Sequence, residues 1–335
     1  MMNYNNRNNT TGYHPLLADD SPSIVLVDSS NAFFNWYYSA LASYNRSQGR
    51  TKGSTVVESD FAGMKRLKSV FESKCRSKIG GIISLTGASP RDIVFAFDCQ
   101  RSEIWRHDYM SKGDSPHIYK ASRPTCTDIG IGLMRAFLYR ELLPQIVPNP
   151  GVGAPRAEAD DVIAVLTRLI THRAPQRRVF VFTDDSDFVQ LLDHPSVVIY
   201  TQRHRLMRDK YPTDPKKFLR MKCLMGDRSD NIGGAFPRCG PKTALSLVED
   251  PVLLATKIRT HGSEKLNRNQ KLIDFDFIPR YVCSKIIERG LCARNPPSGH
   301  PHDEISDDEF SDDGILLDVD PDELARASLR TRAHT

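Results

Sequence analysis

Four short runs of aliphatic and aromatic residues constrain the fold of this 335-residue chain more than any other feature. The runs are uninterrupted rather than alternating, which is typical of strands covered on both faces in a parallel sheet. Two amphipathic stretches of helical spacing, Asp60–Lys74 and Ala157–Ile170, lie between them. Strands that alternate with helices indicate an α/β fold, in which helices flank a mostly parallel sheet. The four predicted strands are Ser23–Val27, Asp92–Phe97, Arg178–Phe182 and Ser196–Tyr200.

Changes in composition along the chain predict its domain boundaries. Residues 1–22 are polar, with five Asn among the first nine, so we expect a disordered N-terminus before an α/β domain over 23–200. The segment Thr201–Lys222 carries eight basic and two acidic residues, which predicts a smaller, basic, mostly helical subdomain over 201–294. A linker rich in Pro and an acidic tail follow over 295–335.

The net charge of +5 combines two opposite parts. Of the 46 Lys and Arg three lie in 303–335, and of the 41 Asp and Glu eleven do, so this tail carries −8 and the preceding residues carry +13. A body this basic favours a polyanionic partner such as nucleic acid. No apolar run approaches the roughly 20 residues of a membrane helix, the N-terminus has no hydrophobic signal core, and the seven cysteines form no CxxC pair. We therefore expect a soluble intracellular protein without a membrane partner, a disulfide scaffold or a zinc cluster.

Carboxylates follow three of the predicted strands. In an open parallel sheet, side chains just past the ends of neighbouring strands converge on one crevice. Carboxylates crowded there repel one another unless a cation neutralises them. Oxygen ligands without His or Cys favour Mg²⁺ or Mn²⁺ over zinc, so the crevice suggests metal-assisted phosphate-ester chemistry. The acids at strand ends are Asp28, Asp98, Asp185 and Asp187, and those at a predicted helix start are Glu158, Asp160 and Asp161.

Each acid also has a plainer interpretation when it is taken alone. An Asp after a strand is commonly a turn former or a helix cap. Acids in the first turn of a helix complement its dipole, which contributes about 0.3–1 kcal/mol. The joint occurrence of seven acids, rather than any one of them, carries the metal-site hypothesis.

The basic segment contains the most specific string, GDRSDNI at 226–232, followed by GPKTA at 240–244. Asp227 and Asp230 could supply two further metal ligands. Gly240 before a Pro, Lys and Thr resembles a hairpin that enters a helix, whose free backbone N–H groups suit a DNA phosphate. An ordinary helix start is the alternative for GPKTA alone.

Together these motifs resemble those of the structure-specific 5′-nucleases, the 5′→3′ exonuclease and flap endonuclease family, and most of all its bacteriophage ribonuclease H and flap endonuclease branch. The match covers roughly residues 23–290. It implies a PIN-like or resolvase-like fold with a helical arch over about 101–145 and a C-terminal helix–three-turn–helix subdomain. The implied activity is metal-dependent cleavage of branched or nicked DNA in replication, including removal of RNA primers, by a cytoplasmic monomer (in the host cytoplasm if the protein is viral). The further matching motifs are FD at 97–98, YKASR at 119–123, AEADD at 157–161 and TDDSDFVQLL at 183–192.

The resemblance also implies two Mg²⁺ sites, in which Mn²⁺ may substitute. Asp161 would lie between the sites or just behind the ligands. Two ions would activate a water and stabilise the leaving oxygen. The tighter site would be formed or oriented by Asp28, Asp98, Glu158, Asp160 and Asp185. The second would be held by Asp187, Asp227 and Asp230.

Basic residues receive DNA-binding roles from the same resemblance. Lys120 and Arg123, in the arch, would hold the scissile phosphate and act with Asp185 as the catalytic residues. Arg106 would contact DNA from the arch. The family's Gly-hydrophobic-Gly hairpin reads Arg-Cys-Gly here, so a K⁺ ion bound by its backbone stays in doubt. The residues expected to grip duplex DNA are Arg238, Gly240, Lys242 and Thr243.

Several alternatives stay open at the level of the sequence. A catalytically inactive DNA-binding replication protein on the same scaffold is the main one, although every expected acid is present. A PIN-type ribonuclease shares the acidic crevice but lacks the GDRSDNI and GPKTA elements. Trp105 and Tyr109 fit either base stacking or core packing. The acidic tail fits a sliding clamp, a single-strand-binding protein or simple solubilisation.

In the amphipathic stretch Asp60–Lys74, we expect Phe61, Met64, Leu67 and Phe71 to lie on one face of the helix.

Overall fold

The computed structural model describes residues 22–51, 54–56, 60–110, 119–121, 129–148 and 151–292. Three subjects of the sequence predictions lie outside the described residues. These are the polar N-terminal segment, Arg123 with much of the expected arch, and the linker with the acidic tail.

A five-stranded sheet, parallel throughout, forms the centre of the protein. The strand order is β3-β2-β1-β4-β5, so the chain moves outward from β1 in one direction and then continues from β4 in the other. The four predicted strands are confirmed, and β3 is a short edge strand that the sequence did not predict. The strands are β1 Ser23–Asp28, β2 Ile93–Phe97, β3 Val152–Gly153, β4 Arg178–Phe182 and β5 Val197–Tyr200.

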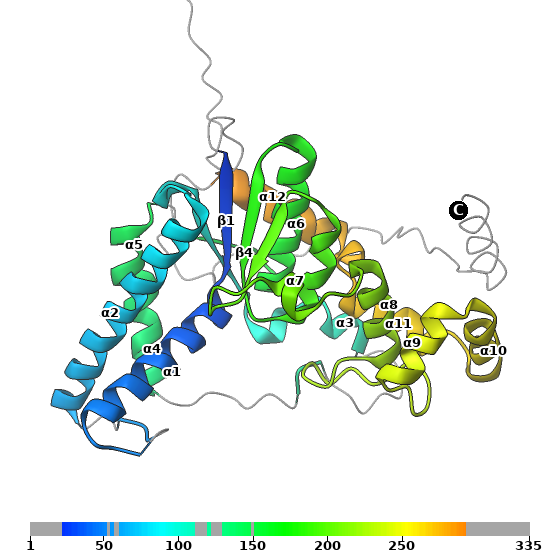
Figure 1. Cartoon of the computed structure of the whole chain (residues 1–335), viewed down its shortest axis with the longest axis horizontal. Helices are drawn as coiled ribbons and strands as arrows, with labels where there is room; N and C mark the ends of the chain where they lie inside the picture. Colours follow the sequence, from blue (N-terminus) through cyan, green and yellow to red (C-terminus); the bar gives the residue numbers. More distant parts are fainter. Residues whose placement is uncertain are drawn as a thin grey trace, which may run out of the picture.

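Helices cover both faces of the sheet, as the uninterrupted apolar strands require (Figure 1). Val25 and Val27 face one layer, whereas Ile24 and Leu26 face the other, because alternate side chains of a strand point to opposite faces. The first layer contains α1 Ser29–Ser47, α2 Phe61–Thr86 and α4 Ile129–Ala136, which continues through a π-helical turn at Phe137–Leu142 into α5 Leu143–Ile146. The second contains α6 Ala159–Arg173 and α12 Arg280–Cys292.

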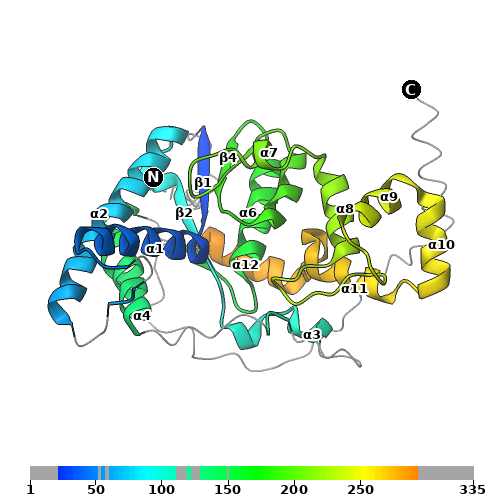
Figure 2. The same cartoon turned by 60° about the horizontal axis from the view of Figure 1, so that its bottom comes forward.

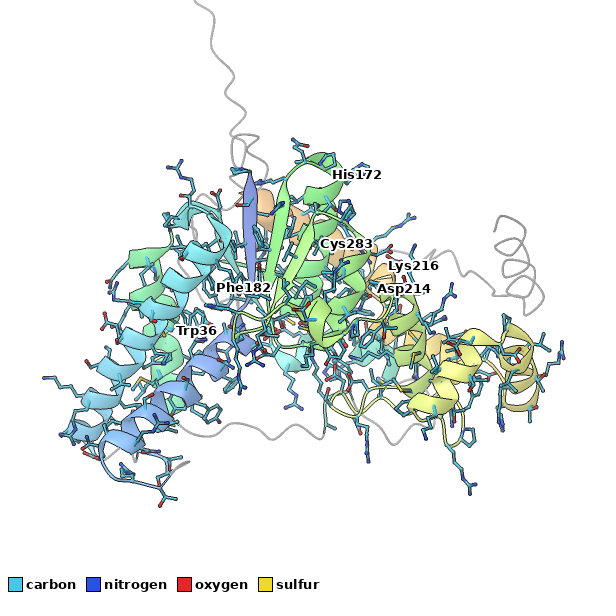
Figure 3. The ribbon with its side chains drawn as sticks, viewed as in Figure 1. Trp36, His172, Phe182, Asp214, Lys216 and Cys283 are labelled. Atoms are coloured by element: carbon cyan, nitrogen blue, oxygen red, sulfur yellow. The ribbon has the colours of Figure 1, made fainter. Side chains whose placement is uncertain are left out.

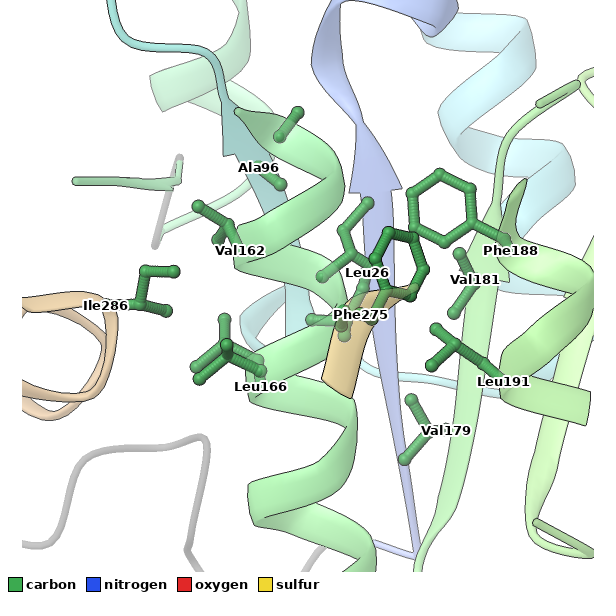
Figure 4. Close-up of a cluster of buried hydrophobic side chains, with 14 of the residues drawn as sticks. Leu26, Ala96, Val162, Leu166, Val179, Val181, Phe188, Leu191, Phe275 and Ile286 are labelled. Carbon is green, nitrogen blue, oxygen red and sulfur yellow. The ribbon is translucent and has the colours of Figure 1, made fainter. Parts of the chain in front are cut away.

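The core of the second layer joins residues far apart in the sequence (Figure 4). Leu26 of β1 and Val162 of α6 belong to the same buried cluster as Phe188, Phe275 and Ile286. The last helix of the predicted C-terminal subdomain, α12, therefore packs within the α/β part, which the boundaries drawn from composition do not anticipate.

The remaining helices lie beyond β5 and α6, on the side of the molecule away from α1 and α2 (Figure 2). Asp214 begins α8 by accepting a hydrogen bond from the Lys217 backbone N–H, at 2.9 Å. These helices enclose a small core of their own, which includes Leu224, Ile232 and Leu247. They are α8 Pro215–Met225, α9 Pro241–Glu249, α10 Pro251–His261 and α11 Glu264–Ile273. Shorter helical segments are Pro90–Asp92, Arg101–Glu103, α3 His107–Met110, Ser186–Asp193, α7 Met207–Lys210 and Phe275–Phe277.

One predicted helix face begins later than the sequence pattern suggested. Leu67 and Phe71 of α2 are fully buried, but Phe61 is 83% exposed. The helix starts only at Phe61, where the Asp60 side chain accepts from the Gly63 N–H at 2.8 Å, so this ring projects from the first turn. Across the ranges that the structure describes, no helix is long and apolar enough to cross a membrane.

Candidate active site

Two strand-end acids are fixed by hydrogen bonds that also shape the fold. Asp28 ends β1 and caps α1, since its Oδ1 accepts from the Asn31 N–H at 3.0 Å and its Oδ2 from the Thr183 hydroxyl at 3.0 Å. Asp98 follows β2, and its Oδ1 accepts from the backbone N–H of Ala159, at 2.9 Å, at the start of α6. These hydrogen bonds at the starts of α1 and α6 place both carboxylates at one edge of the sheet, while their role as metal ligands stays a prediction.

Asp160 and Asp185 complete this group of acids. Asp185 follows β4 and caps the short helix Ser186–Asp193, and Asp160 lies in the first turn of α6. Both line a cavity of about 710 Å³, together with Asp28, Asp98 and Lys120. The sheet topology explains the convergence, since β1 is the point from which the chain departs to either side.

Burial and then neighbouring charges raise the pKa values of three of these acids. Burial, and next the charge of Asp98, raise the pKa of Asp28 to about 7. Burial and then the charge of Asp185 hold the pKa of Asp160 well above its ordinary value. Burial also raises the pKa of Asp185, although Lys222 opposes this shift. The protein therefore needs protons or cations in this cavity to stabilise its own acids.

The donor set fits a hard divalent cation, since the acids of this cavity offer carboxylate oxygens and the Ser30 hydroxyl, which donates to Asp98, adds another oxygen. Among the described residues, however, no three His, Cys, Asp or Glu side chains stand as they would around a metal ion. Two lysines each lie between acids from different elements. Lys120 joins Glu158 to Asp230, and Lys222 lies between two further acids.

Lys120 and Tyr119 connect Glu158, at the start of α6, with Asp230, in the turn between α8 and α9. Lys120 forms ion pairs with Glu158 and, at 3.7 Å, with Asp230. The Tyr119 hydroxyl lies 2.8 Å from Glu158 Oε2 and 3.0 Å from Asp230 Oδ2, so it can donate to either of them. Burial opposes the charge of Glu158, but Lys120 and then Arg106 outweigh burial and lower its pKa. The backbone N–H of Lys120 also donates to the Asp230 carbonyl, at 3.0 Å.

Lys222, in the last turn of α8, pairs with the remaining two acids. Its ammonium contacts Asp187 and lies 2.9 Å from Asp227 Oδ2. Burial opposes the charge of Asp227, but Lys222 and the hydrogen bonds of Ser229 lower the pKa of this carboxyl to about 2. Lys222 was not among the predicted site residues. Its only signal in the sequence was its position five residues before Asp227, within the basic segment.

Arg106 has a different position from the one expected. It was predicted to contact DNA from the arch, but it is 3% exposed and its guanidinium pairs with Glu158 and Asp161. Asp161 is fully buried, and its Oδ2 also accepts from the Trp105 indole at 2.9 Å. Trp105 is therefore a core residue rather than a base-stacking one, and Asp161 holds its neighbours from behind the cavity. Tyr109 packs edge-on against the Trp105 ring.

The turn between α8 and α9 carries Asp227 and Asp230. Gly226 has a φ of +75°, and a Cβ at this position would lie 2.4 Å from the Ile232 carbonyl oxygen. Only glycine fits there, which explains why the acidic turn begins with it. Past this turn, Arg238 and Lys242 are exposed and Thr243 is half-buried, so the residues predicted to grip DNA meet at the exposed N-terminus of α9.

The family model for the N-terminal, resolvase-like domain of 5′-3′ exonucleases matches residues 23–219. The chain belongs to this family. Among the 5′-3′ exonuclease relatives, that of Mycoplasmopsis pulmonis is 28% identical over 168 residues, which are 48% of this chain and 52% of the relative. Ribonuclease H of Enterobacteria phage T4 is 23% identical over 227 residues, 62% of this chain and 72% of the relative. DNA polymerase I of Deinococcus radiodurans is 28% identical over 244 residues, 70% of this chain.

The chain spans about half of the M. pulmonis exonuclease and 22% of the D. radiodurans polymerase. The 5′-3′ exonuclease fold is also shared with solved structures. The D15 protein of bacteriophage T5, crystallised with metal ions, superposes with a TM-score of 0.55 at 20% identity over 80% of this chain and 99% of that one. A T5 D15 flap endonuclease complex with DNA and metal ions gives a TM-score of 0.53 at 18% identity over the same shares. These likenesses confirm the predicted fold class.

Proposed function

We propose that the protein is a metal-dependent 5′→3′ exonuclease and flap endonuclease that cleaves branched or nicked DNA in replication. The observation that carries this proposal is the single cavity that collects carboxylates from the ends of β1, β2 and β4 and from the start of α6. Three of these acids have raised pKa values, so a divalent cation would be strongly attracted to the cavity. The family membership gives this cavity a phosphodiester substrate.

We assign two divalent ions, Mg²⁺ or in its place Mn²⁺, to two groups of acids. They would lower the pKa of an attacking water and stabilise the leaving oxygen. Asp161 serves as a support, since its oxygens are taken by Arg106 and Trp105. K⁺ is not part of the proposal. One ion would be held by Asp28, Asp98, Glu158, Asp160 and Asp185, and the other by Asp187, Asp227 and Asp230.

The basic residues of the chain would bind the substrate around these acids. Lys120 lines the cavity and would turn from Glu158 toward the scissile phosphate. Arg123, which lies outside the described residues, is assigned to the same phosphate. The exposed Arg238 and Lys242 would hold the backbone of the duplex at the N-terminus of α9. The name of the phage T4 relative, ribonuclease H, supports RNA–DNA junctions as additional substrates. We expect the protein to act as a monomer, and to act in the cytoplasm.

A contact with a single-strand-binding protein or a sliding clamp through the acidic tail rests on the sequence of residues 303–335 alone. The alternative function, an inactive DNA-binding accessory protein, would keep the exposed basic residues of α9 but would not need the four acids that share the cavity.

The deciding experiment compares the wild type with Asp185→Asn on a 5′-labelled flap, a nicked duplex and an RNA–DNA hybrid, each with Mg²⁺ and with chelator. We expect Mg²⁺-dependent cleavage by the wild type. Asp185→Asn should lose it while binding DNA as tightly or more tightly, because one negative charge near the phosphate is removed. Asp193→Asn, an exposed acid of the same short helix, is the matched control and should cleave normally. Tight binding without cleavage by the wild type would instead support the accessory protein.

A further inference from the structure

The cavity that contains the acids extends well beyond them. Its far wall follows α1, where Asn31, Phe34, Asn35 and Tyr38 lie on successive turns of one helix face. Tyr38 is eight residues from Ser30, about 12 Å along the helix axis at 1.5 Å per residue. Asp184, which is not one of the nine predicted metal ligands, lines this part of the cavity and accepts hydrogen bonds from the Asn35 side-chain amide at 3.4 Å and from the Gln202 N–H at 3.1 Å.

Tyr38 presents an aromatic face to this part of the cavity. Its ring is nearly parallel to that of Phe34, with an interplanar angle of 18° and centroids 6.3 Å apart. Although large and aromatic, Tyr38 is 54% exposed. The ring is thus fixed on one side by its neighbour and open to solvent over much of its surface.

Two cations line the same part of the cavity. Lys78 of α2 donates to the backbone carbonyl of Gln202, at 2.6 Å, and Arg203 follows directly. Within the described part of the chain, neither Lys78 nor Arg203 forms an ion pair with a carboxylate. Gln202 is itself fixed, because its Oε1 accepts from the Trp36 indole at 3.2 Å and its Nε2 donates to the Phe182 carbonyl at 3.2 Å. Trp36 and Phe182 are labelled in Figure 3.

We propose that Tyr38, Lys78 and Arg203 form a subsite for one nucleotide of a single strand, near the scissile phosphate. The base would stack on Tyr38, and its phosphate would lie between the two cations. An aromatic platform beside cations is the combination by which proteins bind unpaired bases without reading their sequence. The distance of about 12 Å from Ser30 corresponds to no more than about four nucleotides at 3.4 Å each. This inference rests on the proposed nuclease function, and it adds where the unpaired strand lies.

The test uses a set of flap substrates, each with 2-aminopurine in place of one base, at one of five positions on either side of the cleavage point. The 2-aminopurine fluorescence of each substrate is measured with the protein in chelator. For the wild type we expect quenching at one position within four nucleotides of the cleavage point. Tyr38→Ala should abolish it and Tyr38→Phe should retain it, since only the ring is needed. The Kd of Tyr38→Ala should rise about 5- to 100-fold. Quenching that is unchanged in Tyr38→Ala, or absent at every position in the wild type, would overturn the subsite.

The phosphate half of the subsite is tested by Arg203→Ala, with Arg205→Ala as the matched control. Arg205 is an exposed Arg of the same turn that does not line the cavity. We expect Arg203→Ala to weaken flap binding and to lower the slope of log Kd against log salt by about 1, whereas Arg205→Ala should change the Kd less than 2-fold. Equal effects of the two variants would show a diffuse charge effect and no subsite.

Mg²⁺-dependent turnover, measured in parallel, separates this inference from the proposed function. Tyr38→Ala should raise KM and leave kcat within about 2-fold, because Tyr38 does not touch the reacting atoms. If the wild type shows the Tyr38-dependent quenching but no cleavage, the subsite stands and the nuclease proposal fails. If it cleaves without such quenching, the nuclease proposal stands and the subsite fails.

Discussion

Both oxygens of the Asp161 carboxylate accept hydrogen bonds from the Arg106 guanidinium, at 2.8 and 3.0 Å. The pair is buried, and Arg106 also donates to Glu158 at 2.9 Å and to the Leu272 carbonyl at 2.9 Å. One side chain therefore orients two acids at the start of α6 and joins them to the end of α11. This position explains why an arginine expected near DNA is withdrawn from solvent.

Removing the Arg106 side chain should destabilise the whole protein. Arg106→Ala leaves Glu158 and Asp161 buried without this cation, and such a loss typically costs about 3–5 kcal/mol of the free energy of unfolding. Urea unfolding in chelator measures it. Arg76→Ala is the control, because the Arg76–Glu72 pair is exposed and should contribute less than about 1 kcal/mol. A similar small loss for Arg106→Ala would mean that water replaces the guanidinium.

Lys222 should stabilise the metal-free protein and compete with a metal ion. In Lys222→Met, Asp187 and Asp227 face each other without a cation, so we expect the metal-free protein to unfold at lower temperature. Mg²⁺ should bind this variant more tightly, because it no longer displaces an ammonium group. Thermal unfolding with chelator and with Mg²⁺, together with titration calorimetry, gives both quantities. Lys217→Met, at the exposed Lys217–Glu249 pair, is the control. Weaker Mg²⁺ binding by Lys222→Met would contradict competition.

The stability of the metal-free protein should fall as pH rises from about 4 to about 7. Burial, and next the charge of Asp98, raise the pKa of Asp28 to about 7 from its ordinary 3.8, so in this range the folded protein holds a proton that the unfolded chain has lost. Each pH unit then lowers the free energy of unfolding by up to about 1.4 kcal/mol. Asp160 and Asp185, whose pKa values are also raised, act in the same direction.

Urea unfolding at pH 5, 6, 7 and 8 in chelator measures this dependence. Asp28→Asn should flatten it while still capping α1, since Asn is as good a cap as Asp. Saturating Mg²⁺ should remove the fall with pH, because the ion takes the place of the proton. The pKa values of Glu158 and Asp227 are lowered, so these two carboxyls make stability depend on pH only below their ordinary pKa values. That range lies outside the four pH points. Rising stability from pH 5 to 8 in chelator would show that the cavity acids are solvated.

Loss of the Lys120 ammonium should affect the chemical step more than binding. Lys120→Ala removes a cation that lines the cavity beside the acids, so we expect a large fall in kcat and a modest rise in the Kd for a flap substrate. Single-turnover rates and binding in chelator separate the two effects. Similar losses in rate and in affinity would make Lys120 a docking contact only.

The sequence predicted those parts of the structure that depend on neighbouring residues. Continuous apolar runs identified β1, β2, β4 and β5. Asp28, Asp98 and Asp185, which follow β1, β2 and β4, share one cavity because parallel strands end at the same edge. The edge strand β3, two residues long, was too short to leave a pattern.

What the sequence did not predict depends on contacts between distant residues. Lys222 reaches Asp187 across 35 positions, and Arg106 reaches the Leu272 carbonyl across 166. Such partners are set by how helices pack against the sheet, and neither side chain differs by pattern from an exposed basic one. The prediction that Phe61 lies on the buried helix face was wrong, because helical spacing does not show where the neighbouring layer of the fold begins.

The buried bridge from Arg106 to Leu272 has a consequence for the position of the cut. It joins the acids of α6 to the helices that follow β5, and the backbone bond from Lys120 to Asp230 makes a second tie between the same two parts. Under the proposed function, a duplex held at the start of α9 would meet the acids at one fixed offset. The distance from this contact to the cleavage point would then be constant, so that the size of the released fragment follows from where the duplex begins and not from the bases it contains.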